Sequence, residues 1–455
     1  MSNSTKKIIT GPRGWPLSGN LYHLKNDILK KLQDDRARFG SIMKYRIGYY
    51  KYIVINSPEY IRHVLLEQKS NYSKQTLSNE QSKHITGESL LTLHGDDWHK
   101  QRRRMQGAFR KNAVANYYKD MNVATDTFLQ HCQNHQGPIN ITHAMTNLTY
   151  TIVGKALFGA KLQDSQEQIR ESLDIALHYI HGRIESLIRL PLWGYTRKQR
   201  RFKQAIQQFD NIVNSIIEQR HASNDENDLL QKLLISVDEK DQSRMTQQQL
   251  RNEIVTLLLA GHETTANLMT WCLYELASKP DIQEKLYEEV KDIDFSTITA
   301  KQLGSLEYTF RIIQESMRLY PPVWLMERHT INKDEINGYT IPKNTTIIIS
   351  PWVMHRHPEY WAYPNEFNID NFLPENFEKI PDYVFIPFGK GPRMCIGMNF
   401  AIQEAIIILA KIGQQFILDQ ASPANVTPDP SITLRPVKNM QVRFTAREKN
   451  VSHET

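Results

Sequence analysis

The chain has 455 residues, of which 40% are hydrophobic and 23% charged, and its formal net charge is +7. This composition is typical of a folded globular protein, and its basic charge comes with no zinc-finger spacing or other nucleic-acid-binding motif. Cys132, Cys272 and Cys395 lie far apart. They exclude a disulfide framework and a paired-cysteine zinc site, and they favour a reducing, cytoplasmic setting.

Length alone predicts about two to four domains, but no repeat or convincing linker divides the chain. We therefore predict one large, mainly helical domain with a minor sheet region over residues 20–445. Residues 1–20 are expected to form an irregular lead-in, and residues 446–455 a flexible tail. No apolar signal-peptide core and no run of about 18 apolar residues is present, so a membrane-spanning helix is not expected.

Strand-like segments occur near both ends of the chain. They are enriched in β-branched and aromatic residues, as strands usually are. The expected strands lie within residues 41–48, 51–57, 336–341, 345–351 and 440–446.

One long helix is well delimited by its sequence. Thr246 and Gln249 form a capping box, and the helical pattern continues until Pro280 stops it. The span is roughly 30 residues, or about 45 Å, which is long enough to cross most of a domain.

The middle of this helix, LLLAGHETTANLM, is unusual for a core helix. Gly261 costs about 1 kcal/mol of helix stability relative to alanine, and the polar Glu263, Thr264 and Thr265 follow it. A functional site would explain the exception. The alternative is a helix bend stabilised by threonine hydroxyls that bond back to the helix.

The third cysteine stands in an uncommon setting. Cys395 follows Gly391, Pro392 and Arg393, precedes Gly397, and directly precedes a helix-like apolar run. A helix start favours thiolate over thiol, and glycines let the backbone pass close to a flat or bulky group. These features suit an axial ligand of haem iron; the alternative is a buried, inert cysteine.

The string FIPFGKGPRMCIGMNFA at residues 385–401 resembles the haem-binding signature of the cytochrome P450 family. Phe388, Gly391, Arg393, Cys395 and Gly397 match that signature at fixed spacing. The resemblance extends over nearly the whole chain. It implies a mainly α fold with a small β region, in a triangular single domain, and haem b held by an axial thiolate.

A second family motif is ESMR, whose Glu315 and Arg318 match the Glu-x-x-Arg helix and are followed by LYPP, as the family expects. Three residues apart, the two side chains share a helix face and can pair. The alternative is an ordinary surface pair. The family usually places a third partner, an arginine, where this chain has Asn371.

AGHETT at residues 260–265 resembles the oxygen-activation motif of the family. By this resemblance Thr264 and Glu263 are the catalytic residues, because a hydroxyl and an adjacent carboxylate can relay protons from solvent. Ala260 lies on the same helix face as Thr264, and Gly261 makes room for a local widening of the helix.

The resemblance also implies how the cofactor is bound. Trp98 and Arg102 match a pair that meets a haem propionate, and Arg328 and Arg393 match the remaining propionate contacts, since buried carboxylates need cationic partners. Arg103 and Arg104 are expected on a solvated basic face. The full set expected to bind the cofactor is Trp98, Arg102, Ala260, Arg328, Phe388, Gly389, Arg393, Cys395 and Gly397, with Cys395 as the metal ligand.

The implied activity is a monooxygenase that inserts one oxygen atom of O2 into a hydrophobic organic substrate. No reductase follows the haem domain, so a separate ferredoxin or flavodoxin with its reductase is expected to donate the electrons. The enzyme itself is expected to be a monomer. Such donors are usually acidic, which gives a role to a basic docking face made by Lys100, Arg103, Arg104, Arg110, Lys111 and Lys390. Two other functions remain open: a haem-thiolate enzyme of another reaction type, and a non-catalytic haem sensor.

The substrate pocket is expected to include Leu257, Ala260, Trp324 and Leu325, with a contribution from residues 71–92. These four side chains are apolar, which favours a fatty-acid-like or terpenoid-like substrate. Residues 189–204 are equally consistent with an access lid and with a basic connector.

Overall fold

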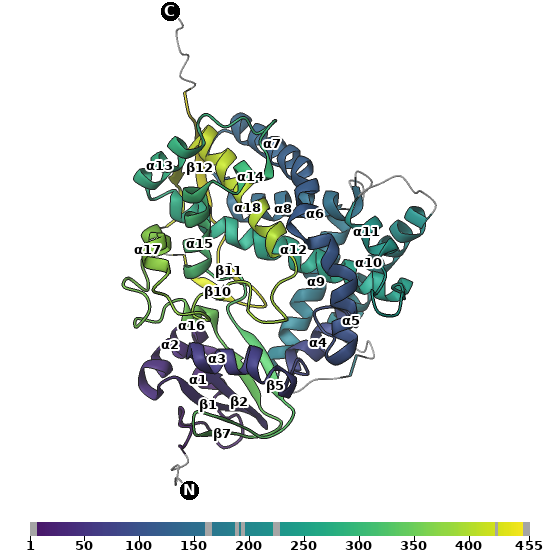
Figure 1. The fold of residues 1–455 in the computed structure, drawn as a ribbon, viewed down its shortest axis with the longest axis vertical. Helices are drawn as coiled ribbons and strands as arrows, with labels where there is room; N and C mark the ends of the chain where they lie inside the picture. The colour runs from purple at the N-terminus through teal and green to yellow at the C-terminus, as the bar shows by residue number, and fades with distance from the viewer. Residues whose placement is uncertain are drawn as a thin grey trace, which may run out of the picture.

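The computed structural model describes residues 7–159, 166–186, 191–192, 196–221, 228–423 and 426–448. Helices occupy most of the view in Figure 1, and β1, β2, β5 and β7 lie together near the N-terminus at the bottom. The predicted mainly helical fold with a small β region is therefore confirmed. Within residues 189–204, whose role was left open, 189–190 and 193–195 lie outside the described residues.

The helices cover the chain from its beginning to its last strands. No helix in the described part of the chain is both long and apolar enough to cross a membrane. The α-helices are α1 (Leu21–Lys25), α2 (Ile28–Phe39), α3 (Pro58–Arg62), α4 (Leu77–Thr86), α5 (Gly95–Gln106), α6 (Lys111–Val114), α7 (Tyr118–Asn134), α8 (Ile141–Phe158), α9 (Gln166–Glu185), α10 (Arg197–His221), α11 (Leu229–Ile235), α12 (Gln247–Leu276), α13 (Pro280–Val290), α14 (Ala300–Leu303), α15 (Glu307–Leu319), α16 (Pro351–Met354), α17 (Pro374–Phe377) and α18 (Met398–Gln415).

The main sheet has five strands in the order β1-β2-β8-β5-β3, and a three-stranded sheet has the order β4-β12-β9. Only β2 and β8 pair in parallel in the main sheet. Each expected strand segment holds a strand, whereas β3, β4, β5, β9, β10 and β11 were not predicted. The strands are β1 (Ile42–Ile47), β2 (Tyr50–Ile55), β3 (Tyr72–Ser73), β4 (Ile139–Asn140), β5 (Met326–Thr330), β6 (Asp334–Ile336), β7 (Tyr339–Ile341), β8 (Thr346–Ile349), β9 (Phe416–Gln420), β10 (Pro428–Pro430), β11 (Leu434–Pro436) and β12 (Gln441–Ala446).

The long central helix forms as its sequence predicts. Thr246 and Gln249 make the reciprocal capping-box bonds that open α12, and α12 ends at Leu276, four residues before Pro280 opens α13. Most of α12 from Leu250 onward is buried against neighbouring helices, but its residues 257, 259–261, 263 and 264 are accessible. A core helix with an accessible middle must border an internal space.

Helix α18 packs as a core element on the other side of this space. Its central residues 404–413 are buried, and apart from Glu404 and Lys411 this stretch is apolar. A Cβ at Gly413 would lie 2.6 Å from the Leu286 side chain, so glycine lets α18 approach α13 closely. α18 therefore provides a rigid support for the loop that precedes it.

Candidate active site

A cavity of about 1520 Å³ lies against the middle of α12. Its walls come from the middle of α12, from α4, from β5 and from the loop before α18. Cys395 and Thr264 both line it, although 131 residues separate them in sequence. The cavity thus joins the two motifs that the sequence singled out.

The loop carrying Cys395 is held in a tight conformation by its own backbone. The Cys395 N–H donates to the Phe388 carbonyl at 2.9 Å, and the backbone of Gly391 adopts a φ of +76°. A Cβ on Gly391 would lie 2.5 Å from the Leu65 carbonyl oxygen. Glycine at 391 is therefore required both by its left-handed backbone and by close approach to the chain beside it.

Cys395 is accessible from the cavity, as expected of a ligand, but one electrostatic expectation was wrong. The sequence predicted a lowered thiol pKa. Burial raises the pKa of the Cys395 thiol, and the Gly397 N–H and the Arg102 guanidinium only partly oppose this effect. Protein groups alone thus favour the thiol, and a bound metal cation would supply the missing charge, because a coordinating thiol is deprotonated.

Cations line the same cavity, of which Arg328 is buried and Arg393 is half-buried. Arg328 donates to the backbone carbonyl of its neighbour Glu327, and Arg393 to that of Leu93, so neither bond neutralises a charge. Burial lowers the pKa of Arg328 to about 10, and burial together with Arg328 lowers that of Arg393 to about 9. This arrangement calls for an anionic partner inside the cavity.

The expected pair on α5 lies beside these cations. Trp98 is buried, and the Arg393 guanidinium lies 4.4 Å from its ring centroid. Arg102 donates to the Met394 carbonyl at 3.0 Å, next to Cys395. Neither Trp98 nor Arg102 is part of the cavity lining itself. They contact Arg393 and Met394 of the Cys395 loop instead.

Sequence reasoning missed one cation in this set, Lys74. It lines the cavity, and burial followed by repulsion from Arg328 and Arg393 lowers its pKa to about 7, while Glu327 opposes the shift. Residues 71–92 were expected to contribute to the pocket, but nothing in their sequence marked this lysine.

The cavity therefore fits the group that the resemblance implies. Haem b is a flat iron complex with two carboxylates, and the cavity offers an accessible thiol and the cations Arg328, Arg393 and Lys74. Phe388, Gly389, Gly397 and Ala260 also line it.

On α12, the two expected catalytic side chains point to different partners. Thr264 Oγ1 donates to the Ala260 carbonyl at 2.6 Å, which is the back-bonding that the sequence left as an alternative. Glu263 Oε1 accepts a hydrogen bond of 2.6 Å from the Thr433 hydroxyl. Thr433, between β10 and β11, carried no sequence signal, because it lies 170 residues away.

The local widening expected at Gly261 is not present, because α12 is α-helical throughout. The glycine has another structural reason. A Cβ there would lie 3.2 Å from a methyl group of Val153 on α8, so Gly261 allows the two helices to pack closely.

The expected substrate-pocket residues Leu257, Trp324 and Leu325 line the cavity together with Ala260. Trp324 is largely buried, and its indole N–H donates to the Ser431 carbonyl at 2.9 Å. It therefore forms a fixed part of the wall. Further wall residues, which the sequence did not identify singly, are Leu77, Ser78, Ser82 and Ile85 of α4 and Ile432.

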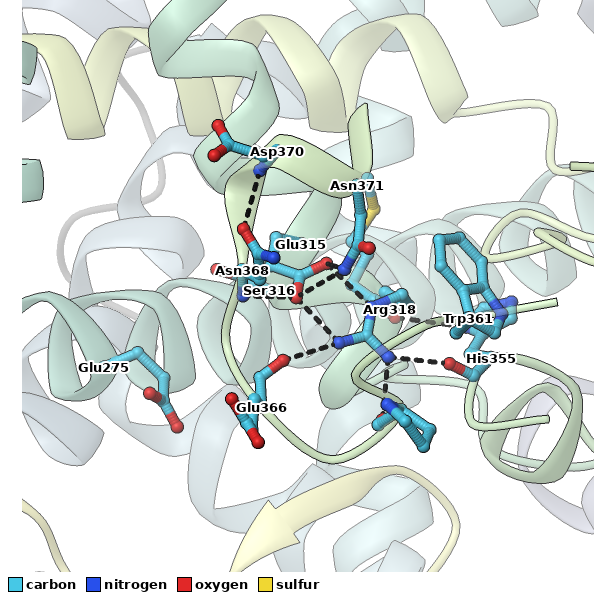
Figure 2. A network of polar contacts seen from close by, with 12 residues as sticks. Glu275, Glu315, Ser316, Arg318, His355, Trp361, Glu366, Asn368, Asp370 and Asn371 are labelled. Atoms are coloured by element: carbon cyan, nitrogen blue, oxygen red, sulfur yellow. Dashed lines mark hydrogen bonds and ion pairs between the residues drawn. The ribbon is translucent and has the colours of Figure 1, made fainter. Parts of the chain in front are cut away.

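Glu315 and Arg318 on α15 form a fully buried ion pair, so the surface-pair alternative is wrong. Arg318 donates to both Glu315 oxygens at 2.7 Å and also donates to carbonyls of the facing loop (Figure 2). The accepting carbonyls are those of His355, Pro364 and Glu366, at 2.9, 2.8 and 2.7 Å. The pair ties α15 to the segment that leads to the Cys395 loop.

Asn371 takes the place of the expected third charge. Its amide lies 3.3 and 3.4 Å from the two Glu315 oxygens, and the Asn368 N–H donates to Glu315 at 2.7 Å (Figure 2). Two neutral donors thus complete the hydrogen bonding of Glu315. Burial raises the pKa of Glu315, and Arg318 counteracts this rise. The network is closed without a second arginine.

We expect Asn371→Asp to destabilise the protein by about 1–3 kcal/mol at neutral pH, because it replaces a donor to Glu315 by a carboxylate. The free energy of unfolding in urea measures this. Asn376→Asp is the matched control, since its amide faces the Asp370 carbonyl and not Glu315. Equal losses in the two variants would contradict the assigned role of Asn371.

The expected basic docking face has fewer free cations than the sequence suggested, because some of its members are buried or form ion pairs. Arg104 is buried and donates to Ser243, so its expected solvated position is wrong. Other members pair with carboxylates: Lys100 with Asp241, Arg103 with Asp238, and Lys390 with Asp382. Arg110 and Lys111 are exposed.

Comparisons with known proteins identify the family of this chain. The family model for cytochrome P450 matches residues 9–444. Among curated proteins, pentalenene oxygenase of Streptomyces avermitilis is 29% identical over 98% of this chain and 99% of its own. Cyclooctatin synthase of Streptomyces melanosporofaciens is 29% identical over 93% of this chain and 92% of its own. Putative cytochrome P450 132 of Mycobacterium tuberculosis is 30% identical over 90% of each chain.

The fold has a solved counterpart in the crystal structure of the cytochrome P450DA heme domain. The TM-score is 0.88, with 24% identity, and the match covers 97% of this chain and 98% of that one. The family model and the fold thus cover nearly the whole chain. The chain belongs to the cytochrome P450 family, whose monooxygenases use haem b with a cysteine thiolate as axial ligand, O2 and electrons from a redox partner.

Proposed function

We propose that this enzyme hydroxylates an apolar organic substrate, with Cys395 as the haem ligand and with Thr264 and Glu263 as the residues that handle protons. The observation that carries the proposal is that Cys395 and the accessible middle of α12 line one central cavity. Haem b with an axial thiolate supplies the oxygen-activating chemistry when bound.

Arg328 and Arg393 bind the cofactor carboxylates in this proposal, with Arg102 and Trp98 as support. The two arginines border the cavity and donate to backbone carbonyls, so their charges remain for an incoming anion. Arg102 also holds the Met394 carbonyl and so the position of the Cys395 loop. Phe388, Gly389, Gly397 and Ala260 provide the remaining contact surface.

In this proposal Thr264 and Glu263 transfer protons one after the other. The Thr264 hydroxyl donates a hydrogen bond to the Ala260 carbonyl. Rotation of the hydroxyl would direct its hydrogen into the cavity instead. The Glu263 carboxylate, held by Thr433, borders the same cavity and can return the proton through water. A hydroxyl next to a carboxylate is suited to such a relay.

The substrate proposed here is a hydrocarbon of terpenoid-like or fatty-acid-like type. The expected pocket residues Leu257, Ala260, Trp324 and Leu325 are apolar, and the cavity volume of about 1520 Å³ accommodates a substrate beside a cofactor. Pentalenene oxygenase, a relative at 29% identity, favours a terpenoid-like compound.

The electron donor proposed here is an acidic ferredoxin or flavodoxin served by its own reductase. Arg110 and Lys111 are exposed cations in the segment after α5, near the start of α18, where Asn399 donates to the Phe109 carbonyl at 3.2 Å. Cys132, Cys272 and Cys395 are free thiols, which supports a cytoplasmic enzyme.

Thr264→Val tests the proposed function. Loss of the hydroxyl is expected to lower the product formed per electron consumed by about tenfold, because a proton-handling group is lost at the reacting centre. The measurement compares product and peroxide release with O2 and an electron donor. Thr270→Val is the matched control, since Thr270 bonds back to Ala266 in the same helix and lies outside the cavity lining.

Three outcomes separate the functions. Product from O2 and electrons in the unmodified enzyme, with a loss in Thr264→Val alone, supports the monooxygenase. Product from hydrogen peroxide but none from O2 and electrons identifies another haem-thiolate reaction. Ligand binding without product from any oxidant identifies a sensor.

A further inference from the structure

A second cavity, of about 870 Å³, adjoins the first on the α9 side of α12. It is lined by α9, by residues 196–201 at the start of α10, and by the segment around Ser431 and Arg435. Asp174 and His178 on its rim are solvent-exposed. This cavity thus connects the protein surface with the interior near α12.

The two cavities share part of their walls. His181 and Gly182 of α9, Glu263 of α12 and Ser431 border both of them. His181 is partly buried, with 25% of its side chain exposed, and its Nε2 lies 3.4 Å from Glu185. Two titratable groups, His181 and Glu263, therefore lie at the boundary between the surface cavity and the active-site cavity.

Thr433 positions Glu263 at this boundary. The Asn267 amide donates to the Thr433 hydroxyl at 3.0 Å, and the hydroxyl in turn donates to Glu263 at 2.6 Å. Thr433 is only 6% exposed, and its one hydroxyl hydrogen is committed to the carboxylate. The Glu263 carboxylate is thereby fixed at the wall that the cavities share.

The proposed reaction consumes protons that must reach this wall. Hydroxylation of a substrate RH follows RH + O2 + 2 e⁻ + 2 H⁺ → ROH + H2O, so two protons enter for each product. The central cavity also has ionisable lining residues, but Arg328 and Arg393 among them are assigned to the cofactor carboxylates. The second cavity is lined by ionisable groups, namely Asp174, His178, His181, Arg183, Lys198, Arg201, Glu263 and Arg435.

We propose that the second cavity is the proton uptake route of this enzyme, in which His181 passes protons through water to Glu263 across the shared wall. An imidazole suits this step because one ring nitrogen can accept a proton while the other releases one. Thr433 is a positioning residue in this route. The inference rests on the proposed monooxygenase function and names the source of its protons.

His181→Gln removes the proton carrier, and Gly182→Leu closes the passage without touching a titratable group. A Cβ at Gly182 would meet no atom within 4 Å, so the larger side chain extends into open space on α9. Product formation is measured twice, once with O2 and an electron donor and once with hydrogen peroxide. Peroxide brings its own protons and electrons, since RH + H2O2 → ROH + H2O.

The ratio of electron-driven to peroxide-driven product formation is expected to fall by about tenfold in both variants. The solvent deuterium isotope effect on electron-driven turnover is expected to rise in His181→Gln. His178→Gln is the matched control: it borders the second cavity alone, at the exposed rim, and should keep the ratio.

Unchanged ratios in His181→Gln and Gly182→Leu would overturn the proposed route, and so would an equal fall in His178→Gln. Failure of the proposed function has a different signature. In that case the unmodified enzyme itself gives no electron-driven product, whatever the variants do.

Discussion

Replacing Cys395 with serine is expected to lower electron-driven product formation by more than about 100-fold, since even outer partners of metal ligands are worth about 10–100-fold. The Cys395 side chain borders the cavity, where burial raises the pKa of its thiol and a bound metal cation would favour the thiolate. A serine hydroxyl at this position would be a much poorer anionic ligand. Product assays, together with haem content and the absorption spectrum, measure the effect.

The control for Cys395→Ser is Cys132→Ala. Cys132 is buried on α7 and takes no part in the cavity, so its loss should leave the haem spectrum unchanged. Circular dichroism of both variants separates loss of ligation from loss of fold. A serine variant that keeps the thiolate-type spectrum and full turnover would contradict the assignment of Cys395.

Replacing Arg318 with leucine is expected to destabilise the protein by about 3–5 kcal/mol, because it leaves the Glu315 carboxylate buried without its cation. Both side chains are 0% exposed. Arg318 also serves the His355, Pro364 and Glu366 carbonyls, which would lose their donor. Urea unfolding of the haem-loaded protein measures the loss.

Arg311→Leu is the control on the same helix, since Arg311 is half-buried and lies 5.1 Å from the Tyr308 ring, away from the network. A double variant with leucine at 315 and 318 should recover part of the stability, because no unpaired carboxylate then remains. A loss for Arg318→Leu no larger than that for Arg311→Leu would show that the buried pair has no structural role.

The features that local sequence encodes were predicted well. The capping box of α12 and the strand segments have signals within a few residues, and they form where expected. The ten residues from Phe388 to Gly397 form the expected cofactor loop. Its glycines Gly389 and Gly391 adopt the left-handed backbone conformation. Motifs of this kind locate a site before any tertiary contact is known.

Features that depend on distant contacts were not predictable. Thr433 reaches Glu263 across 170 residues, and no local pattern marks a threonine near a carboxylate that far away. Lys74 lies near Arg328 because it follows β3, which pairs with β5 far away in the sequence.

Burial decided the remaining differences between expectation and structure. It reversed the expected direction of the Cys395 pKa shift, and it placed Arg104 in the interior although the basic run around it suggested a solvated face. Neither effect can be read from charge and helix position alone, because both depend on which neighbours cover the side chain.

The absorption spectrum of the reduced, haem-loaded protein with carbon monoxide tests the central claim most directly. That claim is that the Cys395 sulfur ligates the haem iron in the cavity beside α12. The account predicts the band typical of thiolate-ligated haem in the unmodified protein and its loss in Cys395→Ser. A spectrum of histidine-ligated type in the folded, unmodified protein would contradict it.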